Sequence, residues 1–284
     1  MTLEVISEFA AFGGKVGFYR HASQVNQCAM QFAVYQPPQA EDRKVPVLTW
    51  LSGLTCSEET FMIKGGAQRI AAALGLIIVA PDTSPRGDDV PDDPEAAYDF
   101  GLGAGFYLNA TEEPWSQYYN MYDYVTAELP EIIGAEFPAD LTRQGIFGHS
   151  MGGHGALTIG LKNPDVYWSI SAFAPICSPT NCPWGQKALG NYLGSDQTQW
   201  ADYDATTLVK NLGDAGPANP ILIDQGLADQ FLEQELHPHL FESACGDADV
   251  ELELRRHVGY DHGYYFISTF MEDHLRHHAK YLRD

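Results

Sequence analysis

The chain has 284 residues, 45% of them hydrophobic and 12% aromatic, which is enough for a sizeable core in one domain. Its formal net charge of −22 opposes binding to nucleic acid and to anionic membranes. The five cysteines lack Cys-x-x-Cys spacing, the N-terminus is acidic, and no apolar run approaches the ~20 residues of a membrane span. We therefore expect a cytoplasmic protein with free thiols.

The first 80 residues predict a sheet that begins antiparallel and continues parallel. Residues 3–36 are read as antiparallel strands with a turn at Gly13-Gly14, and residues 37–44 as a polar loop. The nearly continuous apolar run 45–51 is typical of a strand buried on both faces. An amphipathic helix around 67–74 and a second buried strand at 76–80 complete a strand–helix–strand unit, which predicts parallel pairing.

The remainder of the chain alternates between an irregular segment, helices and strands. Residues 83–116 are rich in Pro, Gly, Asp and aromatic residues, which predicts an ordered loop near a functional site or a packed surface loop. A helix is expected over 118–133, ended or kinked by Pro130. The later predictions are strands at 145–147, 169–174, 221–224 and 251–258, and helices at 156–162 and 266–282.

The segment Gly148-His149-Ser150-Met151-Gly152 matches the G-x-S-x-G pattern between a predicted strand and a predicted helix. In that setting a sharp turn exposes the serine hydroxyl at the top of a sheet, and the glycines let strand and helix approach closely. The backbone N–H of Met151 is then expected to donate to an oxyanion. The N–H of Leu54, in the small-residue loop after the 45–51 strand, is the second candidate donor.

An acid and a histidine follow Ser150 in the chain order Ser, Asp, His. Asp229 follows the 221–224 strand, and His262 follows the 251–258 strand. His262 is expected to remove the Ser150 proton, while Asp229 fixes the histidine tautomer. Asp224 stays open as an alternative acid; otherwise it is expected to form a turn and cap nearby backbone.

These positions predict an α/β protein with the α/β-hydrolase fold. Its sheet would be central and mostly parallel, with antiparallel N-terminal strands and helices on both faces. Residues 1–284 are expected to form a single domain. No metal, nucleotide or flavin cofactor is expected.

The other histidines and Cys56 have simpler interpretations. His149 and His154 are expected to shape the elbow, and His257 to lie on the sheet. Cys56 is either a thiol near the site whose oxidation would block substrate, or a small buried residue. Helical spacing also suggests a metal site at the C-terminal end, but we expect a solvated helix end there instead, formed by His274, His277 and His278.

Several stretches together resemble S-formylglutathione hydrolases, the esterase D group of α/β-hydrolases. The elbow is generic to serine hydrolases, whereas Ser52-Gly53-Leu54-Thr55-Cys56 and Pro183-Trp184-Gly185 are more specific. The resemblance spans nearly the whole chain. It rests on residues 32–35, 51–56, 82–87, 101–107, 148–157, 182–188, 224–229 and 259–262.

The resemblance implies a cofactor-free serine thioesterase, often a homodimer, that hydrolyses S-formylglutathione to formate and glutathione in formaldehyde detoxification. It implies that Ser150, Asp229 and His262 form the triad, and that Leu54 and Met151 supply the oxyanion N–H groups. Trp184 would line the acyl pocket. Gly263 stands where the family often has serine, which could loosen the His262 loop.

Two questions remain open at this stage. A general short-chain carboxylesterase, an acyltransferase and a non-catalytic binding protein are alternatives on the same scaffold. Glutathione is also anionic, as is this chain. We expect Arg86 and Lys187 to lie in the substrate pocket with Cys56 and, helped by Lys64, to offset that charge locally.

Overall fold

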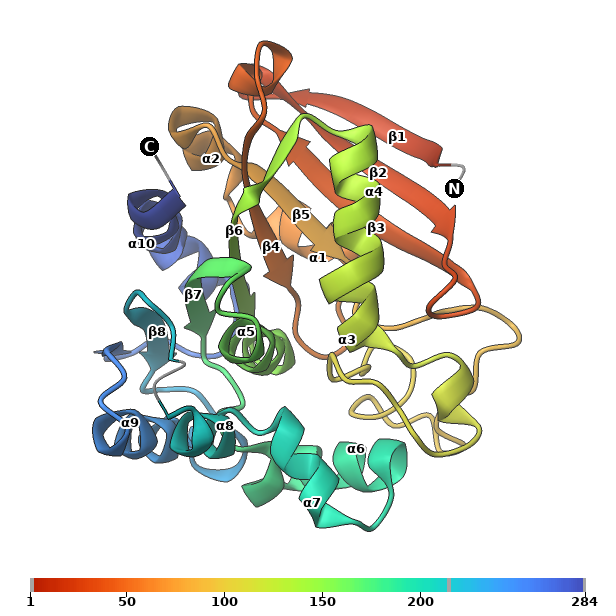
Figure 1. The fold of residues 1–284 in the computed structure, drawn as a ribbon, viewed down its shortest axis with the longest axis vertical. Helices are drawn as coiled ribbons and strands as arrows, with labels where there is room; N and C mark the ends of the chain where they lie inside the picture. Colours follow the sequence, from red (N-terminus) through yellow and green to blue (C-terminus); the bar gives the residue numbers. More distant parts are fainter. Residues whose placement is uncertain (1–2, 214–215, 283–284) are drawn as a thin grey trace.

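A sheet of nine strands forms the centre of the computed structural model, which describes residues 3–213 and 216–282 (Figure 1). The strand order is β1-β2-β3-β5-β4-β6-β7-β8-β9. β1 (Glu4–Ala11), β2 (Gly14–Ala22) and β3 (Ala29–Gln36) pair antiparallel, and β3 joins β5 antiparallel. The parallel strands are β4 (Val45–Leu51), β5 (Ile77–Pro81), β6 (Ala139–His149), β7 (Tyr167–Phe173), β8 (Ile221–Gly226) and β9 (Leu252–His257). The predicted fold class is confirmed.

Helices cover both faces of the sheet, which is why all seven residues of β4 are buried. One face is covered by α1 (Glu58–Lys64), α2 (Gln68–Leu74) and α10 (Tyr264–Leu282). The opposite face is covered by α4 (Leu129–Glu136), α5 (Met151–Lys162), α8 (Ala205–Asn211) and α9 (Pro238–Asp247). Beyond the carboxyl ends of the strands lie α6 (Pro183–Leu193) and α7 (Gln197–Trp200), at the bottom of Figure 1. The sequence pattern did not predict α1 or α6 to α9.

The helix expected over 118–133 is present but interrupted. A short α3 (Met121–Asp123) leads into a π-helical segment, Tyr124–Glu128, and then into α4. Pro130 is the second residue of α4. Since proline has no N–H and its ring crowds the carbonyl four residues back, the wider π turn accommodates it without ending the helix.

The C-terminal histidines correct one expectation. His274 and His278 are fully buried between α10 and the sheet, so this is not a solvated helix end. The Ser169 hydroxyl lies 2.7 Å from Nδ1 of His278, and the Ser171 hydroxyl lies 2.8 Å from its Nε2. Burial holds the pKa of His278 well below its usual range. The helix is amphipathic, and the ring nitrogens of the two buried histidines are satisfied by Ser169 and Ser171 on β7 and by Asp224 on β8.

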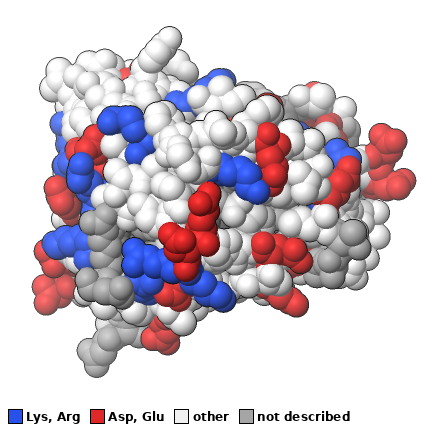
Figure 2. All heavy atoms as spheres, turned by 90° about the horizontal axis from the view of Figure 1, so that it is seen from above, with Lys and Arg blue, Asp and Glu red and all other residues white. Residues whose placement is uncertain are grey.

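Within residues 3–213 and 216–282, no helix combines the length and the apolar character that a membrane span requires. Figure 2 looks onto the molecule from above, at the end of the sheet where the parallel strands begin. Basic and acidic side chains lie next to one another over this face. The negative charge of the chain is therefore interspersed with Lys and Arg here, not gathered into one patch.

Candidate active site

Ser150 occupies the turn between β6 and α5, the strand–turn–helix setting that the sequence predicts. Its backbone has φ +58° and ψ −118°, a conformation that L-residues rarely adopt. The turn is held by the Ser150 N–H, which donates to the Phe173 carbonyl at 3.0 Å. Strain of this kind persists only where the surroundings impose it, and it is concentrated at functional sites.

The two motif glycines are required by close backbone contacts. A Cβ on Gly148 would lie 2.2 Å from the Gly152 carbonyl oxygen. A Cβ on Gly152 would lie 1.9 Å from the carbonyl oxygen of Leu51, the last residue of β4. Both positions therefore exclude side chains, and the elbow packs directly against the end of the neighbouring strand.

His262 and Asp229 meet across the ends of β9 and β8. Nδ1 of His262 lies 2.5 Å from Oδ2 of Asp229, whose side chain is fully buried. The carboxylate also accepts hydrogen bonds from the Phe231 N–H at 2.8 Å and from Nε2 of Gln225 at 3.3 Å. The two loops are tied together by the Ala228 N–H, which donates to the Tyr260 carbonyl at 2.9 Å. A carboxylate in this position can fix the imidazole tautomer.

Asp224, the alternative acid, lies in a different environment. It is fully buried, and Nε and Nη2 of Arg255 donate to its two oxygens, each at 2.6 Å. His257 and His274 lie 3.0 and 3.2 Å away. Burial alone would raise the pKa of Asp224, but the hydrogen bonds from His274 and Arg255 outweigh it and hold that pKa below its usual range. The expectation of a turn-capping carboxylate is wrong, because its partners come from β9 and α10.

A cavity of about 210 Å³ lies at the carboxyl end of the sheet. Both Ser150 and His262 line it, so the serine and the histidine–aspartate pair share one space. The loop after β4 forms another wall, and a Cβ on Gly53 would lie only 3.1 Å from Cβ of Ser150. The lining residues are Gly53, Leu54, Thr55, Cys56, Tyr98, His149, Ser150, Trp184, Phe231, His262 and Tyr264.

The two candidate oxyanion donors come from two different elements next to Ser150, the start of α5 and the loop after β4. Met151 is the first residue of α5, so its N–H belongs to the unpaired N-terminal turn of that helix. Leu54 follows Gly53 in the cavity wall. The carbonyl of Ser52 is held from below by the Tyr107 hydroxyl at 2.8 Å. The arrangement allows two N–H groups to converge on a carbonyl oxygen near Ser150.

The four residues expected in the substrate pocket divide into two pairs. Trp184 and Cys56 line the cavity, whereas Arg86 and Lys187 are not among its lining residues. Arg86 pairs with Asp82 at 2.7 Å, and Lys187 pairs with Asp99 at 2.6 Å and with Asp93 at 3.2 Å. Burial raises the pKa of the Cys56 thiol, which lowers its nucleophilicity at neutral pH.

The elbow histidines lie where they can shape the site. His154 is fully buried, with Nε2 3.0 Å from the Phe106 carbonyl. His149 lines the cavity with its ring centroid 4.4 Å from that of His262. Burial, with the charge of His262 adding to it, holds the pKa of His149 well below its usual range. A neutral ring at this position places no second charge beside His262.

Three aromatic residues, Trp184, Phe231 and Tyr98, line the cavity and are called the aromatic lid below. The sequence predicted only part of this group. Phe231 packs its ring 5.0 Å from that of His262 and 4.7 Å from that of Trp184. Nε1 of Trp184 donates to the Tyr98 hydroxyl at 3.3 Å. Tyr98 belongs to the aromatic-rich 83–116 segment. Its position in the cavity lining supports the expectation that this segment lies near the site. Phe231 carries no signal beyond its position two residues after Asp229.

Gly263 has a defined role at the start of α10. Its N–H donates to Oδ1 of Asp261 at 2.9 Å, and its carbonyl accepts from the Phe266 N–H at 3.1 Å. The loop that carries His262 is therefore hydrogen-bonded at Gly263 itself, and the helix begins without a serine at this position.

Glu58, the first residue of α1, is buried close to the loop after β4, and its Oε2 has no hydrogen-bond partner among the described residues. Burial, with the charge of Asp82 adding to it, raises the pKa of Glu58 to about 7 from an ordinary 4.5. Between these values the folded protein holds a proton that the unfolded chain releases. This group therefore lowers the free energy of unfolding as the pH rises through that window.

Glu58→Gln is expected to become more stable than the wild type as the pH is raised from about 5 to about 8. The gain should reach up to about 3 kcal/mol, at about 1.4 kcal/mol per pKa unit. Urea unfolding at both pH values measures it. Glu59→Gln, on the exposed neighbour, makes the same charge change and should show no such gain. Equal behaviour of the two variants would contradict the prediction.

Comparison with known proteins identifies a matching family and several similar proteins. A family model described as "Putative esterase" matches residues 23–277. Rat S-formylglutathione hydrolase is 54% identical over 283 residues, covering 99% of each chain. The Arabidopsis thaliana S-formylglutathione hydrolase is 53% identical over 282 residues, covering 99% of this chain and 98% of its own. A solved S-formylglutathione hydrolase from Agrobacterium tumefaciens matches with a TM-score of 0.95 at 54% identity, covering 98% of this chain and 99% of its own.

Proposed function

This chain belongs to the S-formylglutathione hydrolases within the esterase family, and we propose that it hydrolyses S-formylglutathione to formate and glutathione. The protein is a serine hydrolase, and its substrate is a small molecule. The observation that carries the chemistry is that Ser150 and the Asp229-paired His262 line one cavity. The substrate is inferred from the relatives that bear that name.

The first half of the proposed reaction forms an acyl-enzyme. Nε2 of His262 takes the Ser150 proton as the hydroxyl oxygen attacks the formyl carbon, and a C–O bond forms. The carbonyl oxygen becomes an oxyanion that accepts from the N–H groups of Leu54 and Met151. The C–S bond then breaks, and the glutathione sulfur leaves with the proton held by His262.

The second half returns the enzyme to its starting state. His262 takes a proton from water, whose oxygen attacks the formyl-serine carbon and forms a second tetrahedral oxyanion. The bond between the formyl carbon and the serine oxygen breaks, and His262 returns its proton to Ser150. Formic acid leaves and ionises to formate. Asp229 steadies the imidazolium in both halves.

The size of the acyl group agrees with the aromatic lid. Trp184 and Phe231 bring two rings into the space in front of His262. A formyl group needs little room there, whereas a long acyl chain would meet these rings. The lid therefore supports a short acyl group and argues against a lipid acyltransferase.

S-formylglutathione is expected to be hydrolysed with a kcat/KM at least a hundredfold above that for p-nitrophenyl acetate. Contacts with the glutathione part that strengthen in the transition state raise kcat/KM. Each factor of ten in kcat/KM requires about 1.4 kcal/mol of such stabilisation. Both rates are measured on one preparation, with a sample inactivated by a fluorophosphonate as the blank. An equal or better rate on the simple ester would overturn the proposal for the substrate and leave the serine hydrolase standing.

That second outcome describes a general short-chain carboxylesterase, and one observation favours it. The charges of Arg86 and Lys187 are already compensated by Asp82, Asp93 and Asp99. They offer an anionic tripeptide no uncompensated cation at these positions. The comparison of the two substrates decides between the readings.

We further propose that the protein works in the cytoplasm as a homodimer. All five cysteines are unpaired, which agrees with a reducing compartment. The dimer rests on the family resemblance. Light scattering on the purified protein at micromolar concentration tests it, and a mass of one chain would overturn it.

A further inference from the structure

We propose that Asp82, Thr83 and Arg86 are positioning residues that hold the oxyanion loop, residues 53–56, in its working conformation. They are called the clamp below. The inference rests on the proposed function in one respect, the use of the Leu54 N–H as an oxyanion donor. It assigns Arg86 a role through the loop, in place of the expected contact with substrate.

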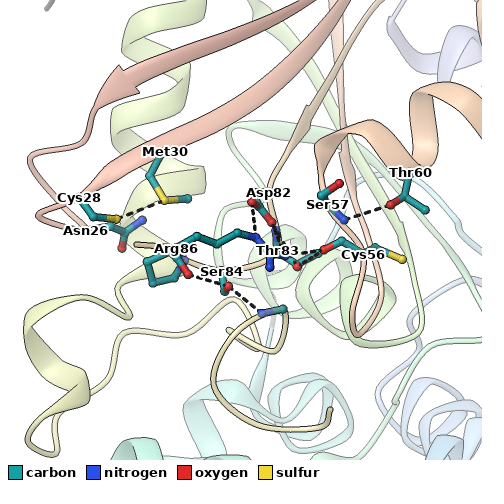
Figure 3. A network of polar contacts seen from close by, with 12 residues as sticks. Asn26, Cys28, Met30, Cys56, Ser57, Thr60, Asp82, Thr83, Ser84 and Arg86 are labelled. Atoms are coloured by element: carbon teal, nitrogen blue, oxygen red, sulfur yellow. Dashed lines mark hydrogen bonds and ion pairs between the residues drawn. The ribbon is translucent and has the colours of Figure 1, made fainter. Parts of the chain in front are cut away.

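The clamp acts on a single atom of the loop, the carbonyl oxygen of Cys56 (Figure 3). Nη2 of Arg86 donates to that oxygen at 3.1 Å, and the Thr83 hydroxyl donates to it at 2.5 Å. Two donors on one carbonyl, one of them charged, fix the orientation of the Cys56–Ser57 peptide group.

Asp82 in turn holds both donors. Nε of Arg86 donates to its Oδ2 at 2.7 Å, and Nη2 donates to its Oδ1 at 3.0 Å. The Thr83 N–H donates to the same Oδ1 at 2.7 Å. Asp82 is 3% exposed, so this two-point pair is shielded on the carboxylate side. With Nε and Nη2 both engaged, the guanidinium is fixed between Asp82 and the Cys56 carbonyl (Figure 3).

The loop needs such support because its conformation is strained. The Cys56 N–H donates to the Gly53 carbonyl at 3.3 Å, closing a four-residue turn with Leu54 and Thr55 at its centre. Thr55 has φ +67°, the third-position conformation of a type II turn, where glycine is preferred. A β-branched residue in that region is unfavourable and is retained only when its neighbours enforce it.

The 83–116 segment supplies a second restraint on the same turn. The Thr55 N–H donates to the Gly103 carbonyl at 2.9 Å, and the Gly103 N–H donates to the Ser84 hydroxyl at 2.8 Å. A Cβ on Gly103 would lie 3.1 Å from Cα of Thr55. The turn is thus held at Thr55 and at Cys56, the two residues that directly follow Leu54, the proposed oxyanion donor. The irregular segment serves the site through these backbone contacts.

A positioning role makes a specific kinetic prediction. The oxyanion exists only in the transition state and the tetrahedral intermediate, so a displaced Leu54 N–H lowers kcat and leaves KM nearly unchanged. Loss of one oxyanion donor lowers kcat by about a hundred- to a thousandfold, and a misplaced donor should cost roughly ten- to a hundredfold. The loss should be equal for a glutathione thioester and for a neutral ester.

The test compares Thr83→Val, which removes one donor to Cys56 while keeping the shape, with Thr83→Ser, which keeps the hydroxyl. Arg86→Ala removes the other donor, and methylguanidine is added to restore it. Arg143→Ala is the matched control, because Arg143 pairs with Asp140 at 2.7 Å at the opposite end of β6. kcat and KM are measured on S-formylglutathione and p-nitrophenyl acetate, per active site titrated with a fluorophosphonate.

We expect Thr83→Val and Arg86→Ala to lower kcat on both substrates with KM within about twofold, and Thr83→Ser and methylguanidine to restore it. A raised KM for the thioester alone in Arg86→Ala would overturn the proposal and return Arg86 to substrate binding. If these variants had a normal kcat per titrated site and a lowered Tm, the proposal would be overturned, because the residues would then support only the stability of the fold. If the wild type fails on S-formylglutathione, the proposed substrate is lost, but the kcat loss on p-nitrophenyl acetate still decides the clamp.

Discussion

Ser150→Ala is expected to lower kcat by about ten-thousandfold to a millionfold on S-formylglutathione and on p-nitrophenyl acetate alike. Without the hydroxyl no acyl-enzyme forms, and His262 has no nucleophile to deprotonate. Residual catalysis can come only from the oxyanion donors and from binding. Steady-state rates with an active-site titration by fluorophosphonate measure the loss, and the titration itself should fall to zero.

The fold should tolerate this change. Alanine removes a single oxygen, and the backbone contacts of the elbow, including the Ser150 N–H to the Phe173 carbonyl, remain. Ser268→Ala, on the exposed side of α10, is the matched control and should keep full activity. If Ser150→Ala retained activity above one per cent of the wild type, the nucleophile would have to be sought elsewhere in the cavity.

Asp229→Asn is expected to lose activity but keep its stability, whereas Asp224→Asn is expected to lose stability but keep its activity. The two variants together form the second test. Asp229→Asn should lower kcat by about ten-thousandfold with little change in stability. An amide at this position can donate to Nδ1 of His262, which would move the ring proton to the nitrogen that must accept the proton of Ser150. The remaining contacts, such as that from the Phe231 N–H, can persist.

Asp224→Asn should instead lower the free energy of unfolding by about 3 kcal/mol, because Arg255 loses its buried counter-charge and keeps only the half-exposed Asp273, 3.0 Å away. Arg255, His257 and His274 all lie on this carboxylate. Activity per titrated site should stay within a few fold of the wild type. Denaturant unfolding and kinetics on both variants provide the measurements. A stable but inactive Asp224→Asn, with an active Asp229→Asn, would exchange the two assignments.

Much of the architecture was predictable because it depends on local patterns. The strand over residues 45–51 was predicted with its observed bounds, because a nearly continuous apolar run next to a polar loop is typical of a strand buried on both faces. The elbow was predictable because Gly148 and Gly152 lie at two close backbone contacts that leave no room for a side chain. The order Ser150, Asp229, His262 followed from placing each residue after a strand.

The chain by itself thus determined the fold class and which residues are candidates for the triad. Only the tertiary structure decided how they are partnered. Asp224 and Asp229 are both carboxylates near the end of β8, and their difference comes from Arg255 on β9 and His274 on α10. Arg86 looked like a cation for substrate until its pairing with Asp82 and the Cys56 carbonyl was known.

The physical reason is the range of the interactions. Hydrophobic periodicity, glycine positions and proline act on neighbouring residues and can be read along the chain. Hydrogen bonds and ion pairs between side chains depend on which segments the sheet order brings together, as with Cys56 and Arg86, thirty positions apart. A charged or polar side chain therefore acquires its role from contacts that the sequence does not display, and the buried His278 between two serines of β7 is another case.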